Sequence, residues 1–419
     1  MKNLMASAGL LAIGAVGVET AHAQFMAGAE KPWSVAGTLR GFYDDNYNTA
    51  PDGPNRRSSF GFEVRPSVSV NLPLEQTSLT LSYIYSLKYF EDRANNKYDQ
   101  SHDVELALTH NFSERYSLDL ADSFVIAQEP ELIDRVNSNP IRSNGNNIRN
   151  NGAINFHAQL TPLLGVVLGY ANTLYDYEQT GVDSLSARLD RFEHLVTLNT
   201  RWQIQQETVG IVGYDFTAVD HTSNFALNTT GLPIAPSSRD MYAHSFYVGA
   251  EHTFRRDLSG SAKAGVQYVD NYNNPFIGNS VNPYADLSLS YNYSDKGTVT
   301  AGFHSAVNQT DETFNPGGIT SLGTLVQNQE SATLYGSALY KITPKLTGTL
   351  TGQFQNSTFV GGFADGKSDQ FYLVGLNLAY QFTHYISAEI GYNYDNLKSD
   401  LPGRGYDRNR VYAGITASY

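Results

Sequence analysis

The feature that most constrains this fold is an alternation of side chains with a period of two, which recurs along almost the whole chain and occupies its last twelve residues. The segment 408–419 reads RNRVYAGITASY. One face of this segment carries Val411, Ala413, Ile415, Ala417 and Tyr419. Such a period indicates a β-strand with one apolar face. Roughly ten alternating residues followed by a turn recur back to Ser34, which is typical of a transmembrane β-barrel.

The pattern predicts about eighteen strands in an all-β, antiparallel, up-and-down transmembrane barrel. The predicted strands lie near residues 34–46, 58–70, 77–90, 101–112, 116–127, 151–161, 164–178, 189–203, 207–219, 240–254, 258–271, 282–294, 297–309, 329–342, 345–358, 368–383, 385–398 and 408–419.

The connections between these strands alternate between about eight short and about nine long ones. Outer-membrane barrels have tight periplasmic turns and longer extracellular loops, so both termini are predicted to be periplasmic. The stretch 137–151 is rich in Asn, Ser and Gly and has little apolar surface, which predicts a mobile outside loop. The alternative is that this loop folds into the pore as a constriction.

The composition agrees with a membrane barrel. Charged residues make up 16% of the chain, against about 25% in soluble domains, while the chain has 28 Tyr, 21 Phe and 36 Gly. Tyrosine suits the aromatic girdles of a barrel because its ring faces lipid and its hydroxyl faces the headgroups. A soluble β-helix or propeller is the alternative, but we find no short repeat of the kind these folds require.

The N-terminus is predicted to be a targeting segment. It has an early Lys2, an apolar stretch over residues 10–18 and a small-x-small site at residues 21–23. These features predict a signal peptide over residues 1–23 that is cleaved after Ala23. A short periplasmic segment, residues 24–33, and the barrel, residues 34–419, would follow. There is no cysteine, so disulfides are excluded.

No constellation of an enzyme, cofactor site or metal site is apparent, and we predict none of them. Asp44, Asp45 and Asp52 offer oxygen ligands for Ca²⁺, with a solvated acidic loop as the stronger alternative. The net charge of −13 argues against a nucleic-acid partner.

Alternation also predicts which charged side chains line the pore. These are Arg40, Glu63, Arg65, Lys88, Asp103, Glu105, Glu193, Arg201, Lys263, Glu389, Asp395, Arg408 and Arg410. One hypothesis is that Arg40, Arg65, Arg408 and Arg410 form a basic strip that faces the acidic groups of the third, fourth and seventeenth strands and creates a transverse field in the pore. The alternative is a set of lumen salt bridges that stiffen the barrel. Tyr175 and Tyr177 offer a stacking track for sugars as a further alternative.

Four segments resemble the putative β-barrel porin 2 family of Gram-negative outer membranes. They are GTLRGFYDDNYN (37–48), LSYIYSLKYFEDR (81–93), LADSFVIAQEPEL (120–132) and YDRNRVYAGITASY (406–419). The resemblance implies an outer-membrane barrel, with some members encoded beside exopolysaccharide export machinery. It implies no catalytic or binding residues.

Three functions therefore stand as hypotheses, and the first is favoured because about eighteen strands leave an aqueous channel. It is a porin that passes small hydrophilic solutes. The second is a conduit for exopolysaccharide that works with periplasmic export proteins. The third is a structural or adhesive barrel with a closed lumen. The expected partners are outer-membrane lipids, lipopolysaccharide and the barrel-assembly machinery, which would bind the C-terminal strand ending at Tyr419.

Overall fold

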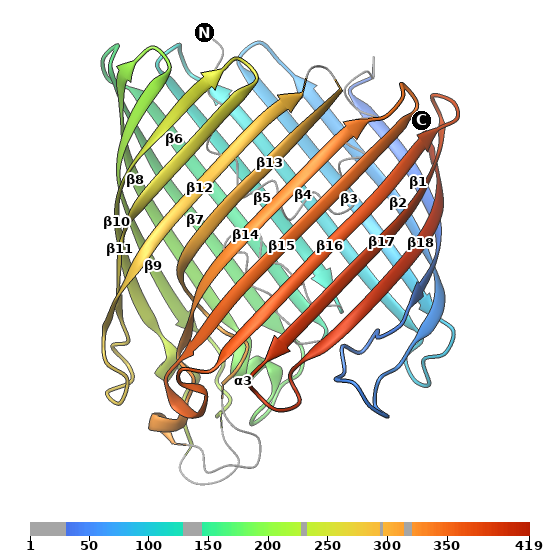
Figure 1. Cartoon of the computed structure of the whole chain (residues 1–419), viewed down its shortest axis with the longest axis vertical. Helices are drawn as coiled ribbons and strands as arrows, with labels where there is room; N and C mark the ends of the chain where they lie inside the picture. The colour runs from blue at the N-terminus through green and yellow to red at the C-terminus, as the bar shows by residue number, and fades with distance from the viewer. Residues whose placement is uncertain (1–30, 129–144, 228–232, 294–295, 314–320) are drawn as a thin grey trace.

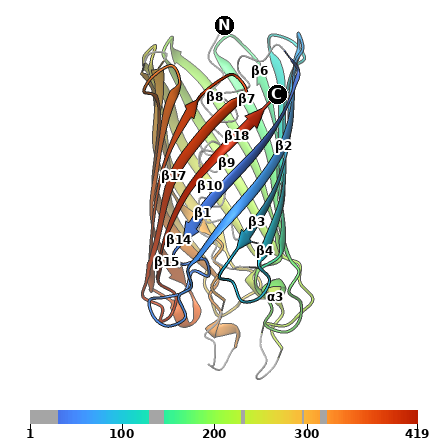
Figure 2. The same cartoon turned by 90° about the vertical axis from the view of Figure 1, so that its right-hand side faces the viewer.

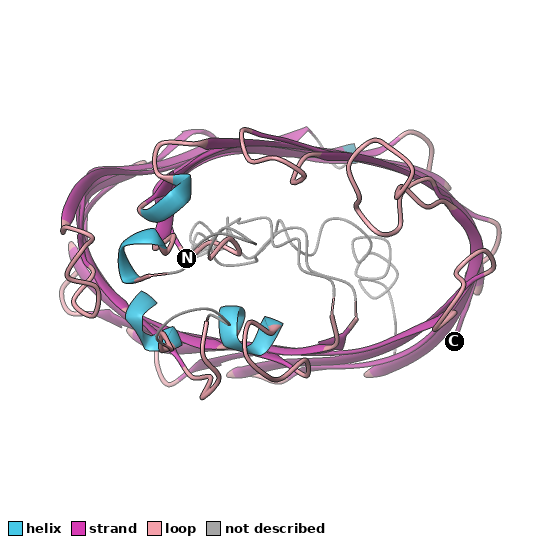
Figure 3. Ribbon diagram, turned by 90° about the horizontal axis from the view of Figure 1, so that it is seen from below, coloured by secondary structure: helices cyan, strands magenta, loops and turns pink. Residues whose placement is uncertain are grey.

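The computed structural model describes residues 31–128, 145–227, 233–293, 296–313 and 321–419. Their strands form one closed antiparallel barrel of 18 strands, in which each strand pairs with its neighbours in the sequence and β1 pairs with β18. The strands are tilted in the barrel wall (Figure 1), and the barrel is oval in cross-section (Figure 3). The predicted fold class and strand number are confirmed.

The first nine strands are β1 (Trp33–Asp44), β2 (Ser59–Pro73), β3 (Thr77–Phe90), β4 (Tyr98–Asn111), β5 (Tyr116–Ala127), β6 (Asn147–Gln159), β7 (Leu164–Tyr177), β8 (Arg191–Gln205) and β9 (Thr208–His221). The other nine are β10 (Met241–Arg255), β11 (Leu258–Asp270), β12 (Ser280–Tyr293), β13 (Gly297–Asn308), β14 (Asn328–Lys341), β15 (Leu346–Val360), β16 (Ser368–Gln381), β17 (Ile386–Ser399) and β18 (Tyr406–Ser418). The described helices are short: α3 (Leu185–Leu189), η1 (Pro236–Arg239), η3 (Leu322–Thr324) and η4 (Gly362–Ala364). None of these helices is long and apolar enough to cross a membrane.

Two ends of the barrel can be distinguished. The short-turn end carries the tight connections, the start of β1 and the end of β18, whereas the long-loop end carries the long connections and the short helices (Figures 1 and 2). At the short-turn end, the Val35 amide donates to the Tyr419 carbonyl at 3.0 Å, and the Tyr419 amide donates back at 2.8 Å. The terminal residue of the chain therefore extends the pairing that closes the barrel.

The seam between β1 and β18 shows how the alternating side chains are divided between the two faces of the barrel wall. The two strands lie side by side (Figure 2), and their register runs from Ala36 opposite Ser418 to Asp44 opposite Arg410. On β1, Leu39 is exposed to the outside while Arg40 is buried on the opposite face. A single-layer barrel buries only its interior face, so the polar set lines the lumen and the apolar set faces lipid.

Several strands begin earlier than predicted, and β6 is the clearest case. It starts at Asn147, so residues 147–151 of the predicted loop belong to the sheet, and residues 137–144 lie outside the described residues. Cross-strand partners explain this. The Asn150 amide donates to Asp122 at 3.0 Å, and the Asn151 amide donates to Thr173 at 2.8 Å. The polar side chains that suggested a loop are hydrogen-bonded to side chains of the neighbouring strands within the barrel wall.

At the long-loop end, β13 separates from β12 and turns toward the interior, while its pairing with β14 continues to Asn308. Its pairing with β12 ends at Ser305, and the Val307 amide instead donates to the Gln267 side-chain oxygen of β11 at 2.7 Å. Val307 then packs on the buried inner side chains Val219, Met241, Ala243 and Val269. We call residues 306–309 the in-folded segment. It brings apolar packing to this side of the lumen.

Candidate functional site: the barrel interior

The interior near the seam is dominated by buried ion pairs. Arg40 donates from Nη1 to Glu63 at 2.9 Å and from Nη2 to Glu389 at 2.6 Å. Glu63 lies directly opposite Arg40 on β2, whereas Glu389 projects from β17, two strands away. One arginine therefore joins β1 to β2 and to β17 across the closing seam. The ring of Tyr412 lies against the guanidinium, with 4.4 Å between its centroid and Cζ of Arg40.

The other two seam arginines are also paired with near neighbours. Arg408 donates from Nε to both oxygens of Asp44 at 3.0 and 2.9 Å, and Arg410 donates from Nη2 to Asp395 at 2.7 Å. Both carboxylates are almost completely buried. The transverse-field hypothesis placed these arginines in a strip that faces separate acidic groups, including those of β17, but β17 adjoins β18 in the sheet. The contacts instead match the alternative, in which neighbouring charges neutralise each other along the lumen wall.

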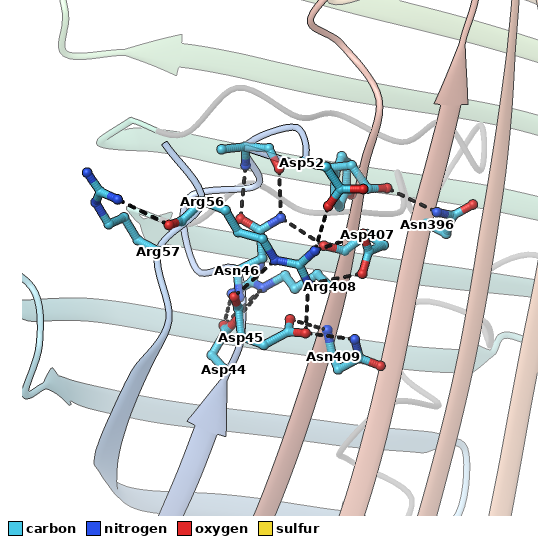
Figure 4. A network of polar contacts seen from close by, with 12 residues as sticks. Asp44, Asp45, Asn46, Asp52, Arg56, Arg57, Asn396, Asp407, Arg408 and Asn409 are labelled. Carbon is cyan, nitrogen blue, oxygen red and sulfur yellow. Dashed lines mark hydrogen bonds and ion pairs between the residues drawn. The ribbon is translucent and has the colours of Figure 1, made fainter. Parts of the chain in front are cut away.

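A second network lies beside the seam at the long-loop end (Figure 4). Arg56, in the connection between β1 and β2, forms ion pairs with Asp45, Asp52 and Asp407 at 2.8 to 3.0 Å. Its hydrogen bond to Asp407 is the main cause that raises the pKa of Arg56. Asp44 is taken by Arg408, so the candidate Ca²⁺ ligands are neutralised by arginine. Over the described ranges, no group of three or more His, Cys, Asp or Glu could hold a metal.

The remaining predicted pore-lining residues lie on the same inner face. Arg65 Nε is 3.8 Å from Glu63, and Lys88 lies opposite Glu63 in the β2–β3 register. Asp103 and Glu105 follow on β4, opposite Ile84 and Ser82. Glu193 accepts from Arg191 at 2.7 Å, and Arg201 donates to Glu251 at 2.6 Å. That these side chains control passage stays a prediction.

Farther from the seam, tyrosine side chains lie on the inner wall. The ring of Tyr247 on β10 lies flat over Gly213 of β9, and the ring of Tyr335 on β14 lies over Gly302 of β13. A Cβ at Gly213 would stand 2.2 Å from the Tyr247 ring, and one at Gly302 would stand 2.3 Å from the Tyr335 ring. Glycine is needed at these positions because the neighbouring ring occupies the space of a side chain.

Charged groups surround these rings. The Tyr247 hydroxyl can donate to Asn199 at 2.8 Å or to Asp215 at 3.1 Å. Lys263 faces Asp286 in the register of β11 and β12, and Asp286 is 3.8 Å from Nδ1 of His304. Of this group, Lys263 was among the charged residues that the alternation predicted to line the pore. Asp215 and Tyr335 were missed because inward-facing Ile211 and Val219 blur the alternation of β9, and the alternation of β14 is equally indistinct.

Two further arginines fasten the long connections, and alternation could not find them because neither lies in a strand. Arg239 of η1, 1% exposed, donates to the carbonyl oxygens of Val326, Arg188 and Thr310 at 2.8 to 3.1 Å. Burial lowers its pKa to about 9. Arg239 therefore joins three long connections to one another.

Arg404 anchors the connection between β13 and β14 through ion pairs. It pairs with Asp311 at 2.7 Å, Glu312 at 2.6 Å and Asp369 at 2.7 Å. Burial opposes the charge of Arg404, but Asp311 and the other two carboxylates raise its pKa. Burial raises the pKa of Glu312. The described parts of these connections are thus packed and cross-linked.

The proposed tyrosine track does not exist as an accessible surface. Tyr175 and Tyr177 are 3% and 2% exposed and pack against Leu189 of α3. The Arg191 guanidinium lies 4.1 Å from the Tyr175 centroid. These rings form the base of a packed loop, so they cannot stack on a passing sugar.

A closed barrel with apolar side chains outside and ion pairs, amides and hydroxyls inside is the architecture of an outer-membrane porin. Residues 35–419 match the family described as putative beta-barrel porin 2. The chain therefore belongs to this family of porins, which places it in the outer membrane of a Gram-negative bacterium. The family predicted from the four segments is confirmed.

No curated protein matches the chain. Among solved structures, OccAB4 of Acinetobacter baumannii is 11% identical, with 93% of this chain and 99% of that chain covered and a TM-score of 0.45. OpdK of Pseudomonas aeruginosa with vanillate is 10% identical, with 92% and 99% covered and a TM-score of 0.45. The siderophore receptor PirA of Pseudomonas aeruginosa is 13% identical, with 92% and 80% covered and a TM-score of 0.42.

Proposed function

We propose that this porin forms a water-filled channel for small hydrophilic solutes. The observation that supports this most directly is the polar interior of an 18-strand barrel, in which charged side chains are paired along the wall. A barrel of about eight strands is filled by its own side chains, whereas one with about 16–18 strands leaves an aqueous channel. Paired charges keep such a wall wet without a strong preference for ions of one sign.

The orientation and targeting belong to the same proposal. The short-turn end and both ends of the barrel chain face the periplasm, and the long-loop end faces outward, as in other bacterial outer-membrane barrels. Residues 1–23 act as a signal peptide cleaved after Ala23, although residues 1–30 lie outside the described residues. The assembly machinery binds the strand that ends at Tyr419, and outer-membrane lipids with lipopolysaccharide surround the apolar outside face.

Two observations favour the closed-barrel alternative. Arg239 and Arg404 fasten the long connections to one another, and the in-folded segment narrows one side of the lumen. We infer a narrowed channel rather than a sealed one, because about 18 strands leave an aqueous interior and the in-folded segment packs on one side of it, against β9 to β11. The comparisons give no support to the exopolysaccharide conduit.

Conductance of single channels tests the proposal directly. The refolded chain from residue 24 onward is reconstituted into a planar bilayer, and current steps are recorded in potassium chloride. Steady steps with weak ion selectivity are expected, because most lumen charges have a neighbouring partner. If the barrel is folded and inserted but no steps occur, the closed barrel replaces the channel.

A further inference from the structure

The inner wall formed by strands β6 to β14 contains a cavity of about 300 Å³. It includes the inner faces of Tyr247, Tyr284 and Tyr335, and the in-folded segment borders it through Ala306 and Gln309. Small-molecule sites generally begin at about 300 Å³, so the cavity has room for a compact solute. It lies beside the in-folded segment. We call this cavity the tyrosine niche.

The charges of the tyrosine niche oppose solutes of either sign. Asp215, Asp286 and Glu193 contribute three carboxylates, of which Glu193 is paired with Arg191 at 2.7 Å, while Lys263 contributes one ammonium group and His304 one imidazole. An anionic solute would meet the carboxylates, and a cationic solute would meet the ammonium group of Lys263. A neutral solute avoids both costs, because it leaves Lys263 opposite Asp286 in the sheet and leaves the ion pair of His304 with Asp286 in place.

The hydrogen-bonding groups of the niche favour a solute that both donates and accepts. The carboxylates and the Asn199 carbonyl oxygen accept, whereas the ammonium of Lys263 and the Asn199 amide nitrogen donate. Much of the remaining lining consists of hydroxyl and amide side chains, such as Thr217, Ser245 and Gln267. Hydroxyl groups of a polyol can satisfy both kinds of partner, because each hydroxyl has one donor and two acceptor sites.

The aromatic rings add a rigid apolar surface. Tyr284 stacks on Tyr247 with ring centroids 5.2 Å apart and 25° between the planes, and it meets His304 edge to face at 6.0 Å. Tyr284 is only partly buried, whereas Tyr247 is 3% exposed and is pressed against Gly213. The position of Tyr284 is therefore fixed before a solute arrives. Pre-positioned rings lose little entropy on binding and suit the C–H faces of a sugar ring.

From these observations we propose that the tyrosine niche binds a neutral polyhydroxylated solute, about the size of a monosaccharide, as it crosses the barrel. The inference rests on the proposed channel and deepens it by naming a solute class and a binding place. The channel then has a saturable step for neutral sugars, whereas charged sugars of equal size cross without such a step.

The test compares three solutes of nearly equal size that differ in charge. Proteoliposomes are loaded with labelled glucose, glucosamine or glucuronate, with the same unlabelled solute at equal concentration on both sides. Exchange then moves no net charge, and conductance is measured in parallel on the same protein. Saturable exchange of glucose, with linear and slower exchange of the two charged sugars, is the expected result.

Three variants localise the effect. Tyr284→Ala should raise the half-saturating glucose concentration by about fivefold or more, since a buried aromatic contact is worth about 1 kcal/mol. Asp286→Asn, which is nearly isosteric, is the second test if Tyr284→Ala folds poorly. It removes one carboxylate from the niche and should therefore make glucuronate exchange faster than in the wild type. Tyr412→Phe is the matched control, because Tyr412 also faces the lumen but lies at the seam, outside the niche. It should leave the glucose saturation unchanged.

The two proposals fail in different ways. Linear exchange of all three sugars at equal rates, with normal conductance, overturns the niche and leaves the channel intact. Saturable exchange of glucuronate or glucosamine instead of glucose overturns the neutral class. Absence of both conductance and exchange from folded, inserted protein overturns the channel, and the niche as a transport site with it.

Discussion

Replacing Arg40 by methionine should destabilise the barrel at its closing seam. Arg40 makes three charge-assisted hydrogen bonds, at 2.9 Å to Glu63 and at 2.6 and 3.1 Å to Glu389. The exposed fraction of Arg40 is 7%, and that of Glu63 is 4%. Methionine would leave two carboxylates facing each other without their shared partner. Removing one member of a buried pair costs about 3–5 kcal/mol.

The lower part of that range is expected here, about 3 kcal/mol, because Ser86 and Asn377 still donate to the two carboxylates. The free energy of unfolding is measured by urea titration of the refolded protein in lipid vesicles. Trp33 lies 6.0 Å from Tyr419, ring centroid to ring centroid, so tryptophan fluorescence reports on the seam when Trp202 of β8 is replaced by phenylalanine in all variants.

Two further variants decide whether the reasoning is correct. Arg56→Met is the matched control, because Arg56 is also paired with carboxylates but its side chain is 25% exposed, so its loss should cost about 1 kcal/mol or less. Adding Glu63→Gln and Glu389→Gln to Arg40→Met should restore more than half of the lost stability. A loss below about 1 kcal/mol for Arg40→Met would refute a buried seam bridge. So would a triple variant no more stable than the single one.

The other predictions concern the wall glycines, the long connections and pH. Gly213→Ala should cost about 1–3 kcal/mol because its Cβ would overlap the Tyr247 ring, whereas Gly37→Ala, with open space around it, should be nearly neutral in the same urea titration. Arg404→Met should speed hydrogen exchange over residues 309–313, since Asp311, Glu312 and Asp369 would then repel one another, and unchanged exchange would contradict this. Burial raises the pKa of Asp240 to about 6, above its unfolded value, so the folded state binds this proton more tightly. Its contribution to stability should therefore be full below about pH 4 and be lost as the pH rises through about 6. Asp240→Asn should remove that part of the pH profile, and a profile identical to wild type would refute the assignment.

The sequence alone determined the barrel, because lipid outside and water inside impose a period of two that survives in single strands such as β3, β16 and β18. It also determined that the first and last strands begin and end on the side of the short turns, because short and long connections alternate. Strand ends were less certain, and β6 shows the reason. Asn150 and Asn151 look like loop residues until Asp122 and Thr173 are placed beside them.

Only the tertiary structure decided how the interior charges are used. Alternation places Arg40 and Glu389 on the same face but cannot say whether they meet or oppose each other across the lumen. That depends on the register across the seam, which pairs residue 40 with residue 414 and residue 414 with residue 389. Arg239 and Arg404 had no sequence signal, because their partners are distant in the chain. The tyrosine niche likewise depends on rings that lie over glycines of neighbouring strands, a contact between side chain and backbone that no periodicity encodes.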